Sequence, residues 1–375
     1  MLSEGDDGRA SLSVGLLATA RMDAPGSMRA YADVLMQAMA MHAPDVDAKL
    51  IEIAAPAGAG TIARRMETVS LPLRAWSRRR EVPHVWHVLD GSRAYIAPAL
   101  ERAPVVITAH DIIPQLQQDG RFAGVPPLGR AARWLWRRNG AAMRGASALV
   151  CDSDSTRQDM ERAYGLPVNA LVVPLPVRPS LLAKASGHVP PRETGVVLHI
   201  GNNGFYKRRE QVLRIFARLD RSVAPTLVMI GPAPVQSMRE LARDLQIDGA
   251  VVWIEDASDV VVADWYQRAS VMVFPSLYEG FGWPVLEAMA FGLPVVCSDA
   301  GSLPEVAGTA APCLAPDDID GFVRETAVLL RDPALALLRA RAGRTRAEAF
   351  GLQRFANDMA AVYRSTFIEW SNKRR

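Results

Sequence analysis

Apolar runs of strand length alternate with amphipathic stretches along most of the chain. The runs that predict buried strands lie at residues 12–18, 85–89, 104–109, 148–151, 195–200, 227–230, 251–254, 269–275 and 293–297. Apolar residues spaced by three or four, such as Tyr31, Leu35 and Ala38, predict helices between these strands. Strands that alternate with helices favour the α/β class with parallel sheets.

The length of 375 residues is typical of two domains. Residues 177–194 combine prolines, glycine and charges without periodicity, which indicates a linker between them. We therefore expect an N-terminal domain at residues 1–185 and a C-terminal domain at residues 186–350, followed by a helical segment at 351–375.

The stretch at 274–305 predicts a strand, a glycine turn, a helix, a second strand and a second glycine turn. Pro284 suits the first turn of that helix, and Gly292 suits its C-terminal cap. Backbone N–H groups at the start of a helix favour an anion, while Glu279 and Glu287 can accept hydrogen bonds from sugar or ribose hydroxyls. The stretch thus fits a sugar-nucleotide site, or else an ordinary βαβ unit with solvated acids.

Two further turns carry candidate chemistry. His110 and Asp111 follow the strand at 104–109, at the strand end where α/β sheets bind ligands. His110 can hold a sugar hydroxyl or transfer a proton, whereas Asp111 can instead cap the turn. The glycine turn at 201–204 leads through Lys207 and Arg208 into another predicted helix.

The segment from Glu279 to Met289 closely resembles the E-x7-E signature of the family-4 retaining glycosyltransferases. The segments Gly292-Leu293-Pro294-Val295-Val296 and Gly301-Ser302-Leu303-Pro304-Glu305-Val306 continue this resemblance, which spans most of the chain at lower density. It implies a GT-B fold, in which two Rossmann-like domains with parallel sheets face each other across a cleft. The C-terminal domain would bind the nucleotide sugar, the N-terminal domain the acceptor, and the last helix would cross back to the N-terminal domain.

The resemblance also implies roles for residues. It makes His110, Lys207 and Glu279 the candidate catalytic residues. It makes the candidate donor-binding residues Gly26, Asn203, Lys207, Arg208, Glu279, Gly280, Phe281, Gly282, Trp283 and Glu287. Glu287 would hold the ribose, Glu279 the sugar hydroxyls, and Lys207 the leaving diphosphate, although Lys207 can also be an ordinary surface lysine. Gly26 matches the family's first glycine loop, or it belongs to an ordinary βα turn.

The chain departs from the family pattern at three positions. Asn202 and Tyr206 stand where many members have arginines, so the contacts with the donor diphosphate differ. Arg208 can compensate for the missing positive charge. Glu255 stands where a glycine is common beside the nucleotide base, which leaves the base open.

The family implies a retaining, metal-independent transfer without a cofactor, in which the leaving phosphate acts as the base. This version of the motif looks like that of bacterial mannosyltransferases, so we expect GDP-mannose as donor and a glycan or lipid-linked acceptor. The alternatives are a catalytically silent sugar-nucleotide-binding subunit and a GT-B sugar-nucleotide epimerase. No predicted strand precedes a GxGxxG motif, which argues against a dinucleotide dehydrogenase.

The charge and the cysteine content restrict the classes of binding partner and the cellular compartment that we expect. The net charge is +3, with 22 Lys and Arg against 18 Asp and Glu in residues 1–185, and no nucleic-acid motif accompanies it. A helix at 126–145 carries a stripe of arginines flanked by two tryptophans, which fits a peripheral contact with the inner membrane surface or an ordinary helix with its tryptophans inward. Three scattered cysteines without CxxC, and no signal-peptide or membrane-spanning pattern, predict a cytoplasmic protein without a disulfide framework or zinc site.

Overall fold

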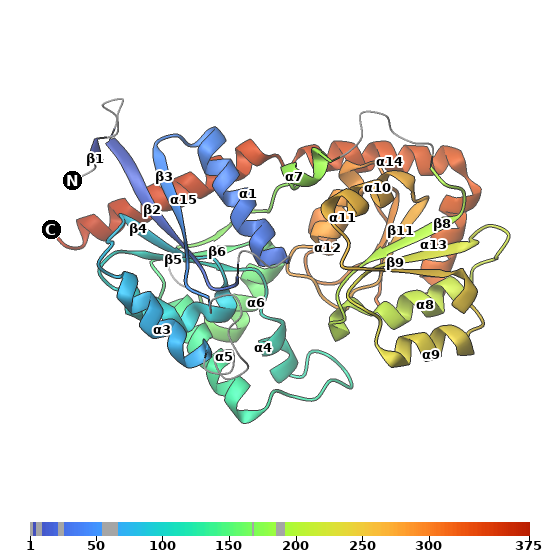
Figure 1. Cartoon of the computed structure of the whole chain (residues 1–375), viewed down its shortest axis with the longest axis horizontal. Helices are drawn as coiled ribbons and strands as arrows, with labels where there is room; N and C mark the ends of the chain where they lie inside the picture. The colour runs from blue at the N-terminus through green and yellow to red at the C-terminus, as the bar shows by residue number, and fades with distance from the viewer. Residues whose placement is uncertain (1–2, 5–9, 22–25, 55–66, 167–168, 185–191) are drawn as a thin grey trace. The chain divides into compact units, whose positions relative to one another are not determined.

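The chain folds into two α/β units, and the first of them combines two separate segments (Figure 1). The computed structural model describes residues 3–4, 10–21, 26–54, 67–166, 169–184 and 192–375. The first unit comprises Met1–Pro176 and Leu352–Arg375, and the second comprises Val177–Gly351. The domain boundary expected between residues 185 and 186 lies outside the described residues, and Val177 to Lys184 belong to the second unit.

The described strands of the first unit form a seven-stranded sheet in the order β1-β2-β4-β5-β6-β7, with β3 paired to β2. Their bounds are β1 (Ser3–Glu4), β2 (Ala10–Ala18), β3 (Val46–Glu52), β4 (Val85–Val88), β5 (Val105–Ala109), β6 (Ala148–Cys151) and β7 (Ala170–Val172). All described pairs are parallel except that of β1 with β2. Strands β4, β5 and β6 are buried along their whole length, as their uninterrupted apolar sequences predict for central parallel strands.

Helices cover both faces of this sheet (Figure 1). They are α1 (Ser27–His42), α3 (Glu67–Arg78), the 3-10 helix η1 (Gly91–Leu100), α4 (Ile113–Gln118), α5 (Arg130–Arg144), α6 (Asp154–Tyr164) and α15 (Leu352–Asn372). Helices α1 and α15 pack on one side, and α3, η1 and α5 lie on the other (Figure 1). The C-terminal α15 is tied to this unit by the buried Tyr363, whose hydroxyl lies 2.8 Å from His87 Nδ1.

The described strands of the second unit form a six-stranded parallel sheet in the order β10-β9-β8-β11-β12-β13. Their bounds are β8 (Val196–Ile200), β9 (Thr226–Gly231), β10 (Val251–Glu255), β11 (Val271–Phe274), β12 (Val295–Ser298) and β13 (Cys313–Leu314). Numbered along the chain this is 3-2-1-4-5-6, the strand order of Rossmann dinucleotide-binding folds. The order reverses between β8 and β11, and ligands in such sheets bind beyond the carboxyl ends of the strands at that point.

The helices of the second unit lie on both sides of its sheet, with α8 and α9 on one side and α10 and α11 on the other (Figure 1). They are α7 (Pro179–Leu182), η2 (Phe205–Lys207), α8 (Arg209–Ala217), α9 (Gln236–Asp244), η3 (Asp248–Ala250), α10 (Asp259–Arg268), α11 (Trp283–Ala290), α12 (Leu303–Ala307), α13 (Ile319–Arg331) and α14 (Pro333–Glu348). Phe216 of α8 and Phe322 of α13 pack with Val273 of β11 in the main apolar core of this unit.

The predicted α/β class is confirmed, as are the predicted strands, but several local details differ. Ser153 caps α6, because its side chain accepts a hydrogen bond from the Thr156 N–H. The segment around 67–78 had no predicted structure and forms helix α3 with Pro72 inside it. Among the described helices, none is both long enough and apolar enough to cross a bilayer.

The three cysteines are free thiols. They are scattered along the sequence, yet two of them lie side by side in the fold. Cys297 and Cys313 are register partners on the parallel strands β12 and β13, with their sulfur atoms 3.6 Å apart. The hydrogen bond between them raises the pKa of Cys297 and lowers that of Cys313.

Candidate functional site

Lys207 and Glu279 meet at the point where the strand order of the second unit reverses. Lys207 ends η2, which follows β8, and Glu279 lies in the turn after β11. The Lys207 ammonium lies 2.8 Å from both carboxylate oxygens of Glu279, and both side chains are nearly buried. Two predicted catalytic residues therefore form one charged pair at the edge of the sheet where a ligand is expected.

The second glycine turn fixes the backbone of Glu279. The Glu279 carbonyl accepts hydrogen bonds from the Ser302 N–H and the Ser302 hydroxyl, both at 3.1 Å. Gly301 has φ 61°, and a Cβ there would lie 2.3 Å from the Glu279 carbonyl oxygen. Only glycine allows this approach, so the turn predicted from Gly301 and Ser302 holds the backbone that carries the Glu279 side chain.

Gly282 begins helix α11, as the sequence predicts. It is the N-cap residue with φ 93°, and a Cβ would lie 2.6 Å from Leu303 Cδ2. Pro284 lies in the first turn, and Gly292 follows the helix with φ 66°. The start of α11 adjoins Gly280, Phe281 and the half-buried Trp283, so the predicted donor-binding turn surrounds a helix N-terminus that favours an anion.

Glu287 is held by groups that the sequence analysis did not identify. Arg178 binds both carboxylate oxygens of Glu287, and the buried Tyr266 hydroxyl donates to Oε2 at 3.0 Å. Arg178 also donates to Asp259 at 3.0 Å. Burial acts to lower the pKa of Arg178, but Glu287 and Asp259 outweigh it and raise that pKa. These bonds use three of the roughly four acceptor positions of a carboxylate. Glu287 therefore has about one acceptor position left for a ribose hydroxyl.

The turn after β8 contains Asn202 and Tyr206, two of the residues that depart from the family pattern. Asn202 Nδ2 donates to the Tyr206 hydroxyl at 3.3 Å, so the two residues that replace the family's basic residues bind each other. The Asn203 amide is held between the Ala233 carbonyl and the buried Arg209. Asn203, which follows β8, is thereby bonded to the segment that follows β9.

The basic residues of this turn point to different partners. Arg209 donates to the Pro232 carbonyl at 2.9 Å, and its guanidinium carbon lies 5.7 Å from the ring centroid of Trp253. Arg208 instead donates to the Pro316 carbonyl at 2.8 Å and pairs with Asp317 at 2.6 Å. Lys207 is therefore the cation of this turn that lies on Glu279, and Arg208 is directed to the loop after β13.

His110 follows β5 in the first unit, as predicted, but both of its ring nitrogens have protein partners. Nδ1 lies 2.6 Å from Asp152 Oδ2, and Nε2 lies 2.9 Å from the Leu89 carbonyl. Burial acts to lower the pKa of His110, but the Asp152 carboxylate outweighs it and raises the pKa to about 9. His110 is thus a fixed cation near neutral pH, with the edge of Tyr31 against its ring.

Asp111, His87 and Gly26 of the first unit have different surroundings. Asp111 accepts a hydrogen bond from the Ile113 N–H at 3.0 Å, so it caps the turn. His87 is fully buried between Tyr363 and Thr108, and burial lowers its pKa to about 3, which makes it a core histidine. Gly26 is the N-cap of α1, and a Cβ there would meet nothing within 4 Å. There is open space around Gly26, but its φ of 157° is a backbone conformation that residues other than glycine rarely adopt.

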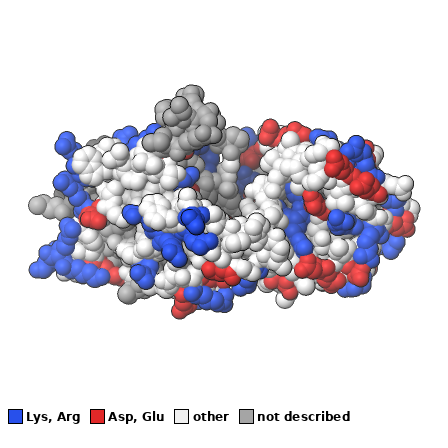
Figure 2. Space-filling view, turned by 90° about the horizontal axis from the view of Figure 1, so that it is seen from below, with Lys and Arg blue, Asp and Glu red and all other residues white. Residues whose placement is uncertain are grey.

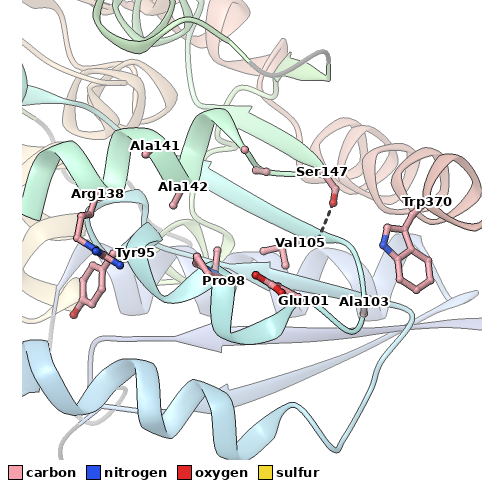
Figure 3. A pocket seen from close by; sticks show the side chains of 13 residues that line it. Tyr95, Pro98, Glu101, Ala103, Val105, Arg138, Ala141, Ala142, Ser147 and Trp370 are labelled. Atoms are coloured by element: carbon pink, nitrogen blue, oxygen red, sulfur yellow. Dashed lines mark hydrogen bonds between the residues drawn. The ribbon is translucent and has the colours of Figure 1, made fainter. Parts of the chain in front are cut away.

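The described cavities lie away from these residues. One of about 550 Å³ sits at the start of β5, opposite to the end that carries His110 (Figure 3). Tyr95, Pro98, Glu101, Arg138, Ser147 and Trp370 are among its lining residues. Among the described residues, no three His, Cys, Asp or Glu side chains are grouped as metal ligands.

Several residues that contact the candidate site residues could not be found from the sequence. Arg178 was assigned to the linker, and Asp152 and Tyr266 lie in segments without a recognisable motif. Arg209 was assigned no role in the sequence analysis. Arg178 and Glu287 are 109 positions apart, so nothing local signals their contact.

Two family models match adjacent parts of the chain. The model described as Glycosyl transferases group 1 matches residues 184–347, and the model described as Glycosyltransferase Family 4 matches residues 52–181. Among similar proteins is the O-antigen chain mannosyltransferase B of Escherichia coli, which is 26% identical over 313 residues, covering 78% of this chain and 77% of that protein.

Solved structures share the fold at low sequence identity. Sucrose-phosphate synthase from Thermosynechococcus elongatus has a TM-score of 0.79 at 18% identity, covering 96% of this chain and 100% of that one. HepE of Anabaena in complex with UDP-glucose has a TM-score of 0.72 at 15% identity, covering 94% of this chain and 100% of that one. At these identities the likeness shows the fold alone.

Proposed function

This chain belongs to the group 1, family-4 glycosyltransferases and has the GT-B fold, and from this we propose a retaining, metal-independent transfer of mannose from GDP-mannose to a glycan or lipid-linked acceptor. Sugar transfer from a nucleotide-sugar donor follows from the family itself. The stereochemical course, the independence from metal, the sugar and the acceptor are the parts that we propose.

The Lys207–Glu279 pair at the switch point is the observation that carries this proposal. In our proposal the donor diphosphate lies against the start of α11 and the Lys207 ammonium, which is a fixed cation for the leaving group. Glu279 then accepts hydrogen bonds from the hydroxyls of the donor sugar. A lysine whose position is fixed before the reaction supplies the positive charge that a metal ion supplies in other enzymes.

Retention is proposed because both carboxylates of the site already have protein partners, so neither is assigned the role of nucleophile or base. Glu279 is already paired with Lys207, and Glu287 is already bound by Arg178 and Tyr266. We therefore assign proton removal from the acceptor hydroxyl to the departing phosphate, which leaves the same face of the sugar that the acceptor enters. In this step the acceptor oxygen bonds to the anomeric carbon, the phosphate oxygen departs, and the phosphate receives the proton.

The choice of mannose is supported by one similarity. The relative from Escherichia coli is named an O-antigen chain mannosyltransferase, and it aligns over most of both chains. A lipid-linked or growing glycan acceptor is the acceptor class that we propose with it. The three free thiols are typical of a reducing compartment, and we propose the cytoplasm and the inner membrane surface as the place of the reaction.

A second function is a catalytically silent subunit that only binds the sugar nucleotide. The hydrogen bond between Asn202 and Tyr206 favours it, because these uncharged residues replace cations at the diphosphate turn. Slow hydrolysis of the donor in the absence of an acceptor separates the two, since only an active transferase produces free sugar.

Calorimetric titration of the full chain with GDP, UDP, ADP and their sugar conjugates, with and without Mg²⁺, tests the proposed donor site. Glu279→Gln is expected to weaken binding of the sugar conjugate more than binding of the bare diphosphate. Glu240→Gln is the matched control, because Glu240 is exposed and bonds only to Gln236 among its described contacts. Binding of no nucleotide, or binding that requires Mg²⁺, would contradict the proposed site.

The anomeric course of the reaction needs its own measurement. Proton NMR of the first product formed from an α-linked donor is expected to show an α linkage. A β-linked product would overturn the retaining course without affecting the donor site.

A further inference from the structure

Helix α3 of the first unit buries two of its apolar side chains and exposes three others, including its tryptophan. Leu71 and Ala75 face the protein and are fully buried. On the outer side, Val69 is 63% exposed, Leu73 68% and Trp76 51%. An ordinary surface helix turns its apolar residues inward, so the outward set is a candidate contact surface.

The three exposed residues form one stripe. Their spacing of four and then three residues puts them on the same face of the helix. Single exposed apolar residues are common on proteins, but a contiguous stripe that includes a tryptophan marks a surface that contacts something apolar.

Arginines flank this stripe. Four arginines lie in or directly after α3, namely Arg74, Arg78, Arg79 and Arg80. The same stretch has two acidic residues, Glu67 and Glu81. The guanidinium carbon of Arg79 lies 3.2 Å from the ring centroid of Trp76, while Glu81 is paired with Arg78 at 2.8 Å. The apolar stripe therefore has a rim of positive charge.

Helix α5 repeats this combination. It contains five arginines and no acidic residue, at positions Arg130, Arg133, Arg137, Arg138 and Arg144. Trp136 is buried as an inward-facing tryptophan should be, but Trp134 is 58% exposed, with Arg138 at 5.1 Å from its ring centroid. The sequence left open whether both tryptophans face inward, and one of them does not.

Helix η1 joins α3 and α5 on one side of the sheet (Figure 1). The hydroxyl of Tyr95 in η1 donates to the Thr68 carbonyl of α3 at 3.0 Å. Tyr95 also lines one pocket together with Arg138 of α5 (Figure 3). Figure 2 views this side and shows blue Lys and Arg side chains spread over the first unit with few red acidic ones.

We propose that α3 and α5 form a docking surface for an anionic lipid bilayer, with Val69, Leu73, Trp76 and Trp134 entering the headgroup region and the arginines binding lipid phosphates. We call this set the α3–α5 face. Apolar and aromatic residues rimmed by arginine are the composition of helices that lie in a membrane interface. The inference deepens the proposed function, because a lipid-linked acceptor would be met at such a surface, but it does not depend on the donor site.

Charge and apolar area together favour a bilayer over nucleic acid. Duplex DNA would use the arginines but offers no apolar phase for Leu73 and Val69. Anionic headgroups attract each nearby arginine, and the acyl boundary accepts the stripe. Binding to nucleic acid is therefore an alternative outcome of the test.

The test is co-sedimentation of the full chain with phosphatidylcholine vesicles and with vesicles that also contain phosphatidylglycerol. We expect binding to the anionic vesicles that weakens as salt is raised, because salt screens the arginines. Leu73→Glu is expected to lower partitioning about tenfold or more through lost apolar insertion. Arg138→Glu is expected to lower it about fivefold or more through lost charge attraction.

Leu338→Glu is the matched control, because Leu338 is 62% exposed on α14 in the second unit. It should leave vesicle binding unchanged, and circular dichroism melting should show all three variants folded. Nucleotide titration of Leu73→Glu should equal that of the wild type, which separates this inference from a failure of the donor site. No binding to anionic vesicles, equal loss in Leu338→Glu, or binding to duplex DNA in preference to vesicles would overturn the proposal.

Discussion

The ammonium of Lys207 lies 2.8 Å from each carboxylate oxygen of Glu279, across the point where the sheet of the second unit reverses its strand order. This pair joins the turn after β8 to the turn after β11, and it is nearly buried. Each partner therefore depends on the other, because removing one would leave the other charge nearly buried and unpaired.

Lys207→Met is expected to lower kcat/KM by about a hundredfold, because the leaving diphosphate loses its fixed cation. It should also lower the free energy of unfolding by about 3 kcal/mol, because Glu279 is left buried and unpaired. The double variant Lys207→Met with Glu279→Gln should regain most of the stability and none of the activity. Steady-state kinetics and urea unfolding measure both quantities, and full activity in either variant would remove the pair from the site.

Arg178→Met is expected to weaken nucleotide binding about tenfold or more, because Glu287 loses the guanidinium that orients it. It should also lower the melting temperature, since the Glu287 carboxylate is almost wholly buried. Arg218→Met is the control, because its ion pair with Asp320 is exposed and contributes little. Equal effects of the two substitutions in calorimetry would show that Arg178 does not position Glu287.

Asp152 is expected to make stability depend on pH through His110. Burial lowers the pKa of His110, but Asp152 raises it to about 9, above the ordinary value of 6.5. The folded chain thus binds this proton more tightly than the unfolded chain, so the contribution is complete below pH 6.5 and is lost as the pH rises to about 9.

Asp152→Asn should remove most of that dependence, because the Asp152 carboxylate is the main group that opposes the lowering of the His110 pKa by burial, with smaller contributions from Asp90 and the Leu89 carbonyl. The exposed Asp119→Asn should leave it unchanged. Urea unfolding across this pH range and NMR titration of the His110 ring measure the two effects. A His110 that titrates near its ordinary value in the wild type contradicts the assigned charge.

Gly301→Ala is expected to destabilise the second unit by about 2 kcal/mol or more, because the new Cβ would lie 2.3 Å from the Glu279 carbonyl oxygen at φ 61°. The strain falls on Glu279, so affinity for the donor should fall as well. Gly249→Ala is the matched control, since a Cβ there meets nothing within 4 Å. Thermal unfolding and calorimetry should separate the two variants, and equal melting temperatures would be evidence against the close approach.

The central strands could be predicted because their apolar runs are uninterrupted. Strands β5, β8 and β11 lie where the sequence placed them. Strand β3 (Val46–Glu52) was missed because its sequence VDAKLIE alternates apolar and polar residues at the edge of the parallel part of the sheet. Helix α3 was missed because three of its apolar residues, including Trp76, face outward, against the usual pattern.

By itself, the sequence determined the α/β class, the family, the glycine turns around α11 and the carboxylates Glu279 and Glu287, because periodicity and turn chemistry are local properties. Only the tertiary structure decided which charges meet. Lys207 binds Glu279 from 72 positions away, whereas its neighbour Arg208 turns to Asp317. The physical reason is that an ion pair depends on distances of a few ångströms, and strand order brings such distant residues together without leaving a local mark in the chain.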